Sequence, residues 1–560
     1  MEKQKTKTSN AITEKKIINV MKKQIKFSIL LFSASLALFS CTDLEIEETD
    51  SILAEGFNGS SSEEANSSLN DMYNSLTDYI GTQESLYSLS EVTTDALLIP
   101  TRGSDWGDNG LWRQMHQHSW NADHRFITNV FNNWNGLQLT ASEIIDDRTE
   151  ASAQVKAEAH FLRALAVYVI LDNYGQVPFR DTKAAAGSNP EVLTGIDAVN
   201  LIVDDLQFAI SNLDPAPVGG DNKRASKTAA RHLLAKVYLN KHVYTKSEVD
   251  NADMNQVVSL VDEISGSGFQ LQEGYYDIFK ANGDSETIFY IPTSVEPRIK
   301  NTLHYNSFEV NGGGWNGFST LAEYYDLFEG DPNSNQVDVN GNPLDGQEER
   351  RGGVPLEGMP IAQANDPLLN GDVNDDGIVD ASNVGNGFLI NQQFATDGSS
   401  LKDRKSNPLS FKRKFTDVGT GEPSLVGNSE VSGIRVIKYN PKYGAQKEHH
   451  IFFRYADAYL MKAEAMFRLG QDPTNMINNL REIRNASPLG SVSEQDILDE
   501  RGRELFTEFW RRNDLIRFGQ YTRDWPFKDP SAVDNPDKKL FPIPSSQVIL
   551  NPNLKQNPGY

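Results

Sequence analysis

Apolar residues along most of this chain recur every three or four positions, the spacing that gathers them on one face of an α-helix. This spacing defines eight helical segments, and they follow one another in pairs. The pairs are residues 64–79 with 125–145, 157–174 with 197–213, 228–240 with 254–264, and 454–469 with 475–484. The pattern therefore predicts a mostly α-helical fold built from helical hairpins.

The segment 157–174 is nearly apolar on every side, and alanine stands at positions 157, 159, 164 and 166. A helix of this kind is buried on several sides, and its small residues allow close packing against a partner. Helix pairs with this property that repeat several times are typical of a tetratricopeptide-like solenoid. A generic all-helical domain has the same periodicity and stays an alternative at this point.

The helical pattern is interrupted most strongly between about residues 270 and 450. This stretch is rich in Gly, Asn, Asp and aromatic residues and contains only short apolar runs, such as 287–292. Loops this long inside a compact chain are usually functional. We expect one domain over 56–560, with a loop-rich, ligand-binding insertion that contains short strands. Helical hairpins are expected near 63–148, 155–265 and 454–486.

The only cysteine of the chain, Cys41, follows a basic start at Lys22 and Lys23 and an apolar run over 27–39. The run is shorter than the ~20 residues that a membrane-spanning helix needs, and the whole pattern is typical of a bacterial export signal. A cysteine directly after Ser40 resembles a lipobox, in which the new N-terminal cysteine carries lipid. An ordinary signal peptide with an unrelated cysteine nearby is the alternative.

The export signal divides the N-terminal region into segments. Residues 1–40 are expected to be removed, and 1–20 are either a wrongly assigned upstream start or a long first part of the signal. Residues 41–55 then form an acidic tether behind the lipid, although a plain disordered linker would have the same composition. Without a second cysteine the exported chain has no disulfide, so its stability must come from a large core.

The composition fits a globular protein and restricts its partners. The chain carries a net charge of −24 with an isoelectric point near 4.8, and 38% of its residues are hydrophobic. Strong acidity argues against binding to nucleic acid or to an anionic membrane surface. No other segment is long and apolar enough to span a membrane, so we expect the lipid to be the only membrane anchor.

Tryptophan is concentrated in two of the long loops. One loop contains Trp106, Trp112 and Trp120 within fifteen residues, and another contains Trp315 beside Asn316. The apolar face of a sugar ring stacks on an aromatic ring, while neighbouring carboxylate, amide and guanidinium groups bind its hydroxyls. We expect Trp112 and Trp120 to belong to the core. Trp106 and Trp315, flanked by Gly, Asp and Asn, are expected to be exposed.

A segment rich in aspartate and asparagine has the spacing of a calcium-binding loop, in which oxygen ligands recur at alternate positions. The expected ligands are Asp372, Asn374, Asp376, Ile378 through its carbonyl, Asp380 and Asn383. Asn383 stands where a bidentate glutamate is usual, so we expect a weak, structural Ca²⁺ site. A metal-free turn is the alternative. His116, His118 and His124 could suggest zinc, but histidines in a Trp-rich loop are more often structural.

Five segments follow one another in a fixed order and span essentially the whole mature chain. They are the TTDALLIPTRG loop, the KAEAHFLRALAVYVILDNYGQVPF and FRYADAYLMKAEAMFRLG helices, the LDERGRELFTEFWRRNDLIRFG segment and the terminal NPNLKQNPGY. The series resembles the SusD/RagB family of outer-membrane glycan-binding lipoproteins. The resemblance implies a tetratricopeptide-like α-helical scaffold that carries an irregular loop region. It also implies a binding protein and not an enzyme.

The resemblance further implies partners and site residues. Such proteins lie over a SusC-like, TonB-dependent transporter, bind oligosaccharide and pass it to the transporter. We therefore expect a lipid-anchored protein on the outer-membrane surface. The residues that match the ligand-contacting regions of the family are Arg102, Trp106, Asn109, Trp315 and Asn316, with Tyr275 or Tyr276 as further candidates. The sequence does not specify the glycan.

Two other functions stay open on the residues alone. A surface-anchored glycoside hydrolase would use a pair of carboxylates, and the chain has many. A tetratricopeptide-like adaptor would bury its tryptophan loops and bind no glycan. The loop composition favours glycan capture over the adaptor, and the resemblance along the whole chain favours it over the hydrolase.

Overall fold

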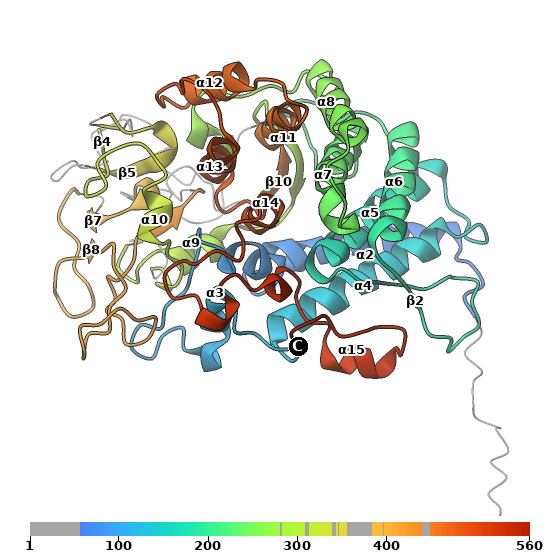
Figure 1. The fold of residues 1–560 in the computed structure, drawn as a ribbon, viewed down its shortest axis with the longest axis horizontal. Helices are drawn as coiled ribbons and strands as arrows, with labels where there is room; N and C mark the ends of the chain where they lie inside the picture. Colours follow the sequence, from blue (N-terminus) through green and yellow to red (C-terminus); the bar gives the residue numbers. More distant parts are fainter. Residues whose placement is uncertain are drawn as a thin grey trace, which may run out of the picture. The chain divides into compact units, whose positions relative to one another are not determined.

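Seven long helices, each packed against the next, form the helical part of the described chain (Figure 1). The computed structural model describes residues 56–280, 283–307, 313–338, 343–344, 346–355, 384–395, 397–439 and 449–560. This succession of packed helices confirms the predicted tetratricopeptide-like fold. In chain order the helices are α2 (Ser62–Gly81), α4 (Arg125–Ile145), α5 (Ala153–Tyr174), α6 (Gly195–Asn212), α7 (Lys227–Thr245), α8 (Asn251–Gly266) and α11 (Tyr455–Arg468).

Two of the predicted sites lie outside the described residues. They are the lipidation site at Cys41, with the export signal before it, and the calcium loop from Asp372 to Asn383. The structure therefore tests neither lipidation nor calcium binding.

Side-chain caps fix where several of the helices begin. Ser61 and Glu64 form a capping box at the start of α2. Ser152 and Ser226 accept hydrogen bonds from backbone N–H groups in the first turns of α5 and α7. These caps satisfy backbone donors that have no partner within a helix. α5 ends at Tyr174, and the next residue, Gly175, has the left-handed conformation (φ 70°) that favours glycine.

α5 is the most deeply buried of the helices. It packs against α4 on one side and α6 on the other, and the four alanines noted in its sequence are fully buried. Small side chains at these positions let neighbouring backbones approach closely, as its pattern predicts. Among the described residues, even so, no helix combines the length and the apolarity needed to cross a membrane.

The C-terminal helices are arranged differently from the first three pairs. α11 packs mainly against α8 and α13 (Glu494–Leu505), while α12 (Thr474–Ile483) has a smaller contact with it. Buried ion pairs give the physical reason. Asp457 of α11 accepts a hydrogen bond from Arg501 of α13 at 2.8 Å, and Glu464 accepts one from Arg517 of α14 (Arg511–Arg517) at 2.7 Å. These pairs orient α11 towards α13 and α14.

The loop-rich region lies on one side of the helices (left in Figure 1) and contains short strands. β3 (Thr287–Ile291) pairs antiparallel with β10 (His450–Arg454), which leads directly into α11. This pairing closes the region at its two ends.

The region also contains a four-stranded sheet. Its strands are, in order across the sheet, β4 (Gln336–Val337), β5 (Gly352–Pro355), β6 (Asn386–Leu389) and β9 (Arg435–Ile437). β7 (Asn391–Gln392) pairs separately with β8 (Ser410–Phe411). The region also holds α9 (Glu296–Thr302) and α10 (Ala322–Tyr325), while β1 (Val177–Phe179), β2 (Glu191–Leu193), α3 (Leu111–Gln117) and α15 (Ser545–Leu550) lie outside it.

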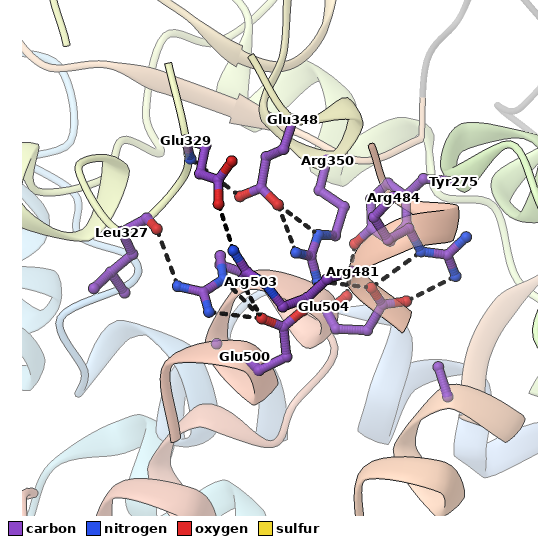
Figure 2. Close-up of polar contacts among 12 residues, drawn as sticks. Tyr275, Leu327, Glu329, Glu348, Arg350, Arg481, Arg484, Glu500, Arg503 and Glu504 are labelled. Carbon is purple, nitrogen blue, oxygen red and sulfur yellow. Dashed lines mark hydrogen bonds and ion pairs between the residues drawn. The ribbon is translucent and has the colours of Figure 1, made fainter. Parts of the chain in front are cut away.

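A buried network of arginine and glutamate side chains attaches the loop-rich region to α12 and α13 (Figure 2). Arg350, from the segment before β5, donates hydrogen bonds to Glu500 of α13 at 2.6 Å and to Glu504 at 3.2 Å. Arg481 of α12 also donates to Glu500, at 2.8 Å. Because these charges are fully or almost fully buried, each depends on its partners to offset the loss of hydration. The network therefore fixes the loop-rich region on the helical scaffold.

Candidate functional site

Trp106 and Trp315, here called the tryptophan pair, come from loops far apart in the sequence and meet in the structure. The indole Nε1–H of Trp106 donates a hydrogen bond to the carbonyl of Trp315 at 2.6 Å. The side chain of Trp315 is 45% exposed, and it is the only one of the seven tryptophans classed as exposed. The hydrogen bond fixes the backbone of Trp315, and the exposed indole that this backbone carries is the kind of surface on which a sugar ring stacks.

Trp106 is half-buried and positions its neighbour. Its ring lies against Trp112 and Phe318, with centroid distances of 5.8 Å and 6.0 Å. Gly317 makes this packing possible, because a Cβ at that position would lie 2.5 Å from the indole. The predicted burial of Trp112 and Trp120 is confirmed. The Gly and Asp residues that flank Trp106 predict that it is exposed, but the structure shows it half-buried.

The loop around Trp106 has an unusual backbone. Trp106, Asp108 and Asn109 all have positive φ angles, of 58°, 36° and 52°. Residues other than glycine are held in this region at a cost of ~1–3 kcal/mol each, and such residues cluster at ligand sites. The side chain of Asn109 is exposed, as a ligand-binding amide would need to be.

Arg102 and Asn316 lie beneath the tryptophan pair and are buried. Arg102 donates hydrogen bonds to the carbonyls of Asn316 and Ser432, at 2.6 Å and 2.8 Å. The side-chain oxygen of Asn316 accepts a hydrogen bond from Arg435 at 2.7 Å. Burial lowers the pKa of Arg102 to about 9. Both predicted ligand residues therefore hold the loops together from inside.

Tyr275 and Tyr276 are also placed in the interior. The Tyr275 hydroxyl donates to the carbonyl of Glu504 and the Tyr276 hydroxyl to that of Arg350, each at 2.6 Å. Burial raises the pKa of both tyrosines well above the ordinary value. With their rings covered and their hydroxyls engaged, they support the scaffold. Of the seven predicted ligand residues, the structure brings Trp106, Asn109 and Trp315 to the surface layer.

Four further residues, here called the polar cluster, lie beside the tryptophan pair. They are Asp105, Tyr305, Arg404 and Glu430. The guanidinium of Arg404 lies 3.8 Å from the ring centroid of Tyr305 and donates to Asp105 at 2.9 Å and to Glu430 at 2.8 Å. Asp105 directly precedes Trp106 in the sequence. On the other side, backbone hydrogen bonds place Gly314 and Trp315 against the 300–304 segment that leads into Tyr305.

The electrostatics of the polar cluster keep its acids charged. Partial burial acts to raise the pKa of Asp105, but hydrogen bonds from Tyr305 and Arg404 outweigh it and lower the pKa. For Glu430 the hydrogen bond from His304 and those from Arg404 likewise outweigh burial and lower the pKa. Burial lowers the pKa of His304 itself to about 4, which leaves it neutral at physiological pH. The cluster thus offers charged acceptors and a fixed guanidinium.

Sequence reasoning missed the polar cluster because its members are distant along the chain. Asp105, Tyr305 and Arg404 are separated by 200 and 99 positions, and of the three only Asp105, beside Trp106 in the Trp-rich loop, lies in a segment that the sequence singles out. The one available signal was the aromatic and polar composition of the long loops.

The histidines of the Trp-rich loop are structural, as expected. Ring nitrogens of His116, His118 and His124 lie within hydrogen-bond distance of the backbone carbonyls of Pro526, Thr93 and Leu111, at 3.0, 2.7 and 3.2 Å. Within the described ranges, no three His, Cys, Asp or Glu side chains are grouped to hold a metal ion.

Known proteins are similar to this chain in both architecture and sequence. The sequence profile of the SusD family matches residues 277–560, and a second profile, described as starch-binding and associating with the outer membrane, matches residues 46–239. The chain belongs to the SusD family. SusD-like homologues are non-catalytic glycan-binding proteins, so this member of the family is not an enzyme. The family relationship also indicates association with the outer membrane.

Individual relatives cover most of the chain. The starch-binding protein SusD of Bacteroides thetaiotaomicron is 26% identical over 522 residues, which is 86% of each chain. The structure of surface glycan-binding protein A from the same organism, in complex with laminarihexaose, has a TM-score of 0.60 at 15% identity, covering 89% of this chain and 100% of its own. A laminarin-binding SusD-like protein has a TM-score of 0.56 at 20% identity, covering 90% and 100%. The two structures show a shared fold.

Proposed function

We propose that this SusD-family protein captures oligosaccharides at the tryptophan pair and delivers them to a SusC-like, TonB-dependent transporter of the outer membrane. The observation that carries the proposal is the hydrogen bond from Trp106 to the Trp315 carbonyl, which fixes the backbone that presents the exposed indole of Trp315 beside the polar cluster. Lipid on Cys41 keeps the protein at the membrane through the acidic tether.

The site offers both kinds of contact that a sugar needs. The exposed indole of Trp315 covers the apolar face of a pyranose, and Asp105, Arg404 and Asn109 bind its hydroxyls. Arg404 is stacked on Tyr305 and hydrogen-bonded at two of its nitrogens before any ligand arrives. Because it is already ordered, binding requires little further loss of side-chain entropy.

The relatives support carbohydrate as the ligand class. One solved relative contains laminarihexaose, another is described as laminarin-binding, and a curated relative is a starch-binding protein. These descriptions name different glycans, so they support the class of ligand and leave the individual sugar open.

Affinity gel electrophoresis tests the site. The purified protein is run through gels that contain neutral or acidic polysaccharides, beside the variants Trp315→Ala and Phe208→Ala. Phe208 is a matched control, because it is an aromatic side chain on α6 that is 38% exposed. We expect at least one polysaccharide to retard the wild type and Phe208→Ala but not Trp315→Ala. Retardation of Trp315→Ala equal to that of the wild type would show that the site is elsewhere.

Delivery to a transporter needs a separate test in cells. We expect a TonB-dependent barrel to co-purify with the tagged full-length protein from detergent-solubilised outer membranes. A clickable palmitate analogue should label the wild type and not Cys41→Ser. Absence of a barrel from the purified complex would contradict delivery to a transporter. Equal labelling of the wild type and Cys41→Ser would contradict the lipid anchor on Cys41.

We also propose that the Asp372–Asn383 loop, whose sequence fits a calcium-binding loop, holds a structural Ca²⁺ ion. Calcium should then raise the thermal midpoint of the wild type and not that of an Asp372→Asn, Asp376→Asn double variant. The same rise in both proteins would place the ion elsewhere, and no rise in either would refute the site.

A further inference from the structure

The loop-rich region contains a positively charged segment, although the protein as a whole is strongly negative. Residues 401–415, here called the basic segment, contain six cationic side chains and one carboxylate, Asp403, and so have a net charge of +5. The whole chain has a net charge of −24. The cations are Lys402, Arg404, Lys405, Lys412, Arg413 and Lys414. A run of cations is often only a solvated surface, so its meaning depends on what it lines.

The C-terminal end of the basic segment lines a groove of about 450 Å³. This volume lies within the range of small-molecule sites. Lys412, Arg413 and Lys414 form part of the wall, and none of the described residues that line the groove is acidic. The other polar groups of the wall are amides and hydroxyls, from Asn333, Asn391, Thr416, Ser429 and Ser432.

Two of the three cations are available to a ligand. Arg413 forms an ion pair with Asp326 at 2.5 Å and donates to the carbonyl of Pro332 at 2.6 Å, so it belongs to the scaffold. Lys412 and Lys414 are exposed, and no carboxylate of the described residues forms an ion pair with either. Two ammonium groups therefore face solvent beside a groove whose described lining contains no acidic residue.

The groove adjoins the tryptophan pair through Arg102. One nitrogen of Arg102 donates to the carbonyl of Ser432, which lines the groove, at 2.8 Å. Its other nitrogen donates at 2.6 Å to the carbonyl of Asn316, next to Trp315. Because a single guanidinium binds carbonyls of both loops, the wall of the groove at Ser432 and the backbone next to Trp315 are neighbours in space. The basic segment also reaches the polar cluster directly, through Arg404.

We infer that the groove is an anionic subsite, and that the glycan captured by this protein carries uronate carboxylates or sulfate esters that Lys412 and Lys414 bind. The inference rests on the proposed function, since it names the chemical class of the captured glycan. A neutral part of the ligand stacks on Trp315, and an acidic residue further along it enters the groove. The acidic remainder of the protein repels a polyanion, so attraction is confined to the basic segment.

Affinity gel electrophoresis with matched polysaccharides separates charge from sugar identity. The uronate arm uses polygalacturonate and alginate, with fully methyl-esterified pectin as the neutral counterpart. The sulfate arm uses a sulfated galactan and the same galactan after desulfation. Starch, laminarin and xylan complete the neutral panel. The variants are Lys412→Gln/Lys414→Gln and a control, Lys246→Gln/Lys555→Gln, which removes two exposed lysines outside the loop-rich region.

We expect the wild type to bind a polysaccharide of the uronate or the sulfate arm at least tenfold more tightly than its neutral counterpart. The Lys412/Lys414 variant should lose this tenfold preference, and 0.5 M NaCl should weaken wild-type binding to the same degree. The Lys246/Lys555 variant should behave as the wild type. Which arm binds identifies the acidic group as carboxylate or sulfate.

Three results would overturn the inference. If only neutral polysaccharides bind, and binding depends on Trp315, the inference fails while the proposed function stands. If no polysaccharide of either kind binds, the proposed function fails and the inference falls with it. If acidic polysaccharides bind the Lys412/Lys414 variant as tightly as the wild type, the groove is not the anionic subsite.

Discussion

Replacing Glu500 with glutamine perturbs the buried arginine–glutamate network of Figure 2 at its centre. Glu500 is fully buried and accepts hydrogen bonds from Arg350, Arg481 and Arg503, at 2.6, 2.8 and 2.6 Å. Burial acts to raise its pKa, but the three guanidinium groups outweigh burial and lower the pKa to about 2. Glu500→Gln keeps the shape of the side chain and removes its charge.

The pKa shift gives the size of the expected effect. The pKa falls from 4.5 to about 2 on folding. At ~1.4 kcal/mol per pKa unit, this corresponds to ~3 kcal/mol of stability. Removing one member of a buried ion pair generally costs ~3–5 kcal/mol of stability, and this range agrees with the value obtained from the pKa shift. Since the folded-state pKa is the lower one, the stabilisation is complete above the unfolded-state pKa and is lost as the pH falls towards 2.

Urea unfolding followed by tryptophan fluorescence measures the effect. We expect Glu500→Gln to reduce the free energy of unfolding by ~3–5 kcal/mol at pH 7, and we expect the difference from the wild type to shrink at pH 3. Glu494→Gln is the matched control, because Glu494 lies on the same helix with its side chain 59% exposed, and it should change stability by less than ~1 kcal/mol. A loss below ~1 kcal/mol for Glu500→Gln, or a difference that stays constant between pH 7 and pH 3, would refute the role of the network.

Three further changes probe the core and the site. Burial raises the pKa of Glu91 to about 8, so wild-type stability falls as the pH rises from 4.5 through 8. In thermal unfolding experiments, the free energy of unfolding of Glu91→Gln should equal that of the wild type at pH 5 and exceed it by ~2–4 kcal/mol at pH 8.5. A difference that does not change with pH would contradict the explanation that a buried acid becomes charged. Gly317→Ala places a Cβ 2.5 Å from the Trp106 ring and should lower glycan affinity about tenfold. The control Gly490→Ala, whose Cβ would lie in open space, should bind glycan as tightly as the wild type. Trp106→Ala should lower both glycan affinity and, by ~2 kcal/mol, the free energy of unfolding; an unaltered thermal midpoint would show that its ring does not support the loop.

The helical scaffold could be predicted because its physical cause is local. Burial of one face imposes a period of 3.6 residues, so α4 begins and ends at the residues that the pattern gave, Arg125 and Ile145. The packing of α11 against α13 could not be predicted in this way. It depends on the pair between Asp457 and Arg501, which are 44 positions apart, and no periodicity reports such a contact.

The candidate site could be predicted only in part, for the same reason. Flanking Gly, Asp and Asn correctly indicated that Trp315 is exposed, because these residues favour turns at the surface. Arg102 looked equally suited to bind a ligand, yet carbonyls from the 316–317 loop and from Ser432 surround it. Arg404 belongs to the site only because Tyr305 and Asp105 lie beside it in space. A charged side chain in a loop gives no local sign of which partners the fold will bring to it.

The exposed face of Trp315 also sets how much affinity it can supply. Of a tryptophan surface of ~250 Å², 45% is exposed, or ~110 Å². If a sugar covers half or all of this area at ~25 cal/mol per Å², stacking contributes ~1.5–3 kcal/mol, which is ~10-fold to ~100-fold in affinity.

Isothermal titration calorimetry tests glycan capture at the tryptophan pair most directly. The wild type and Trp315→Ala are each titrated with one oligosaccharide, which is prepared from the polysaccharide that retards the wild type most. We predict an affinity ~10-fold to ~100-fold lower for Trp315→Ala, with a thermal midpoint within ~2 °C of the wild type because Trp315 is 45% exposed and does not belong to the described hydrophobic core. Equal affinities for the two proteins would contradict glycan capture at this site.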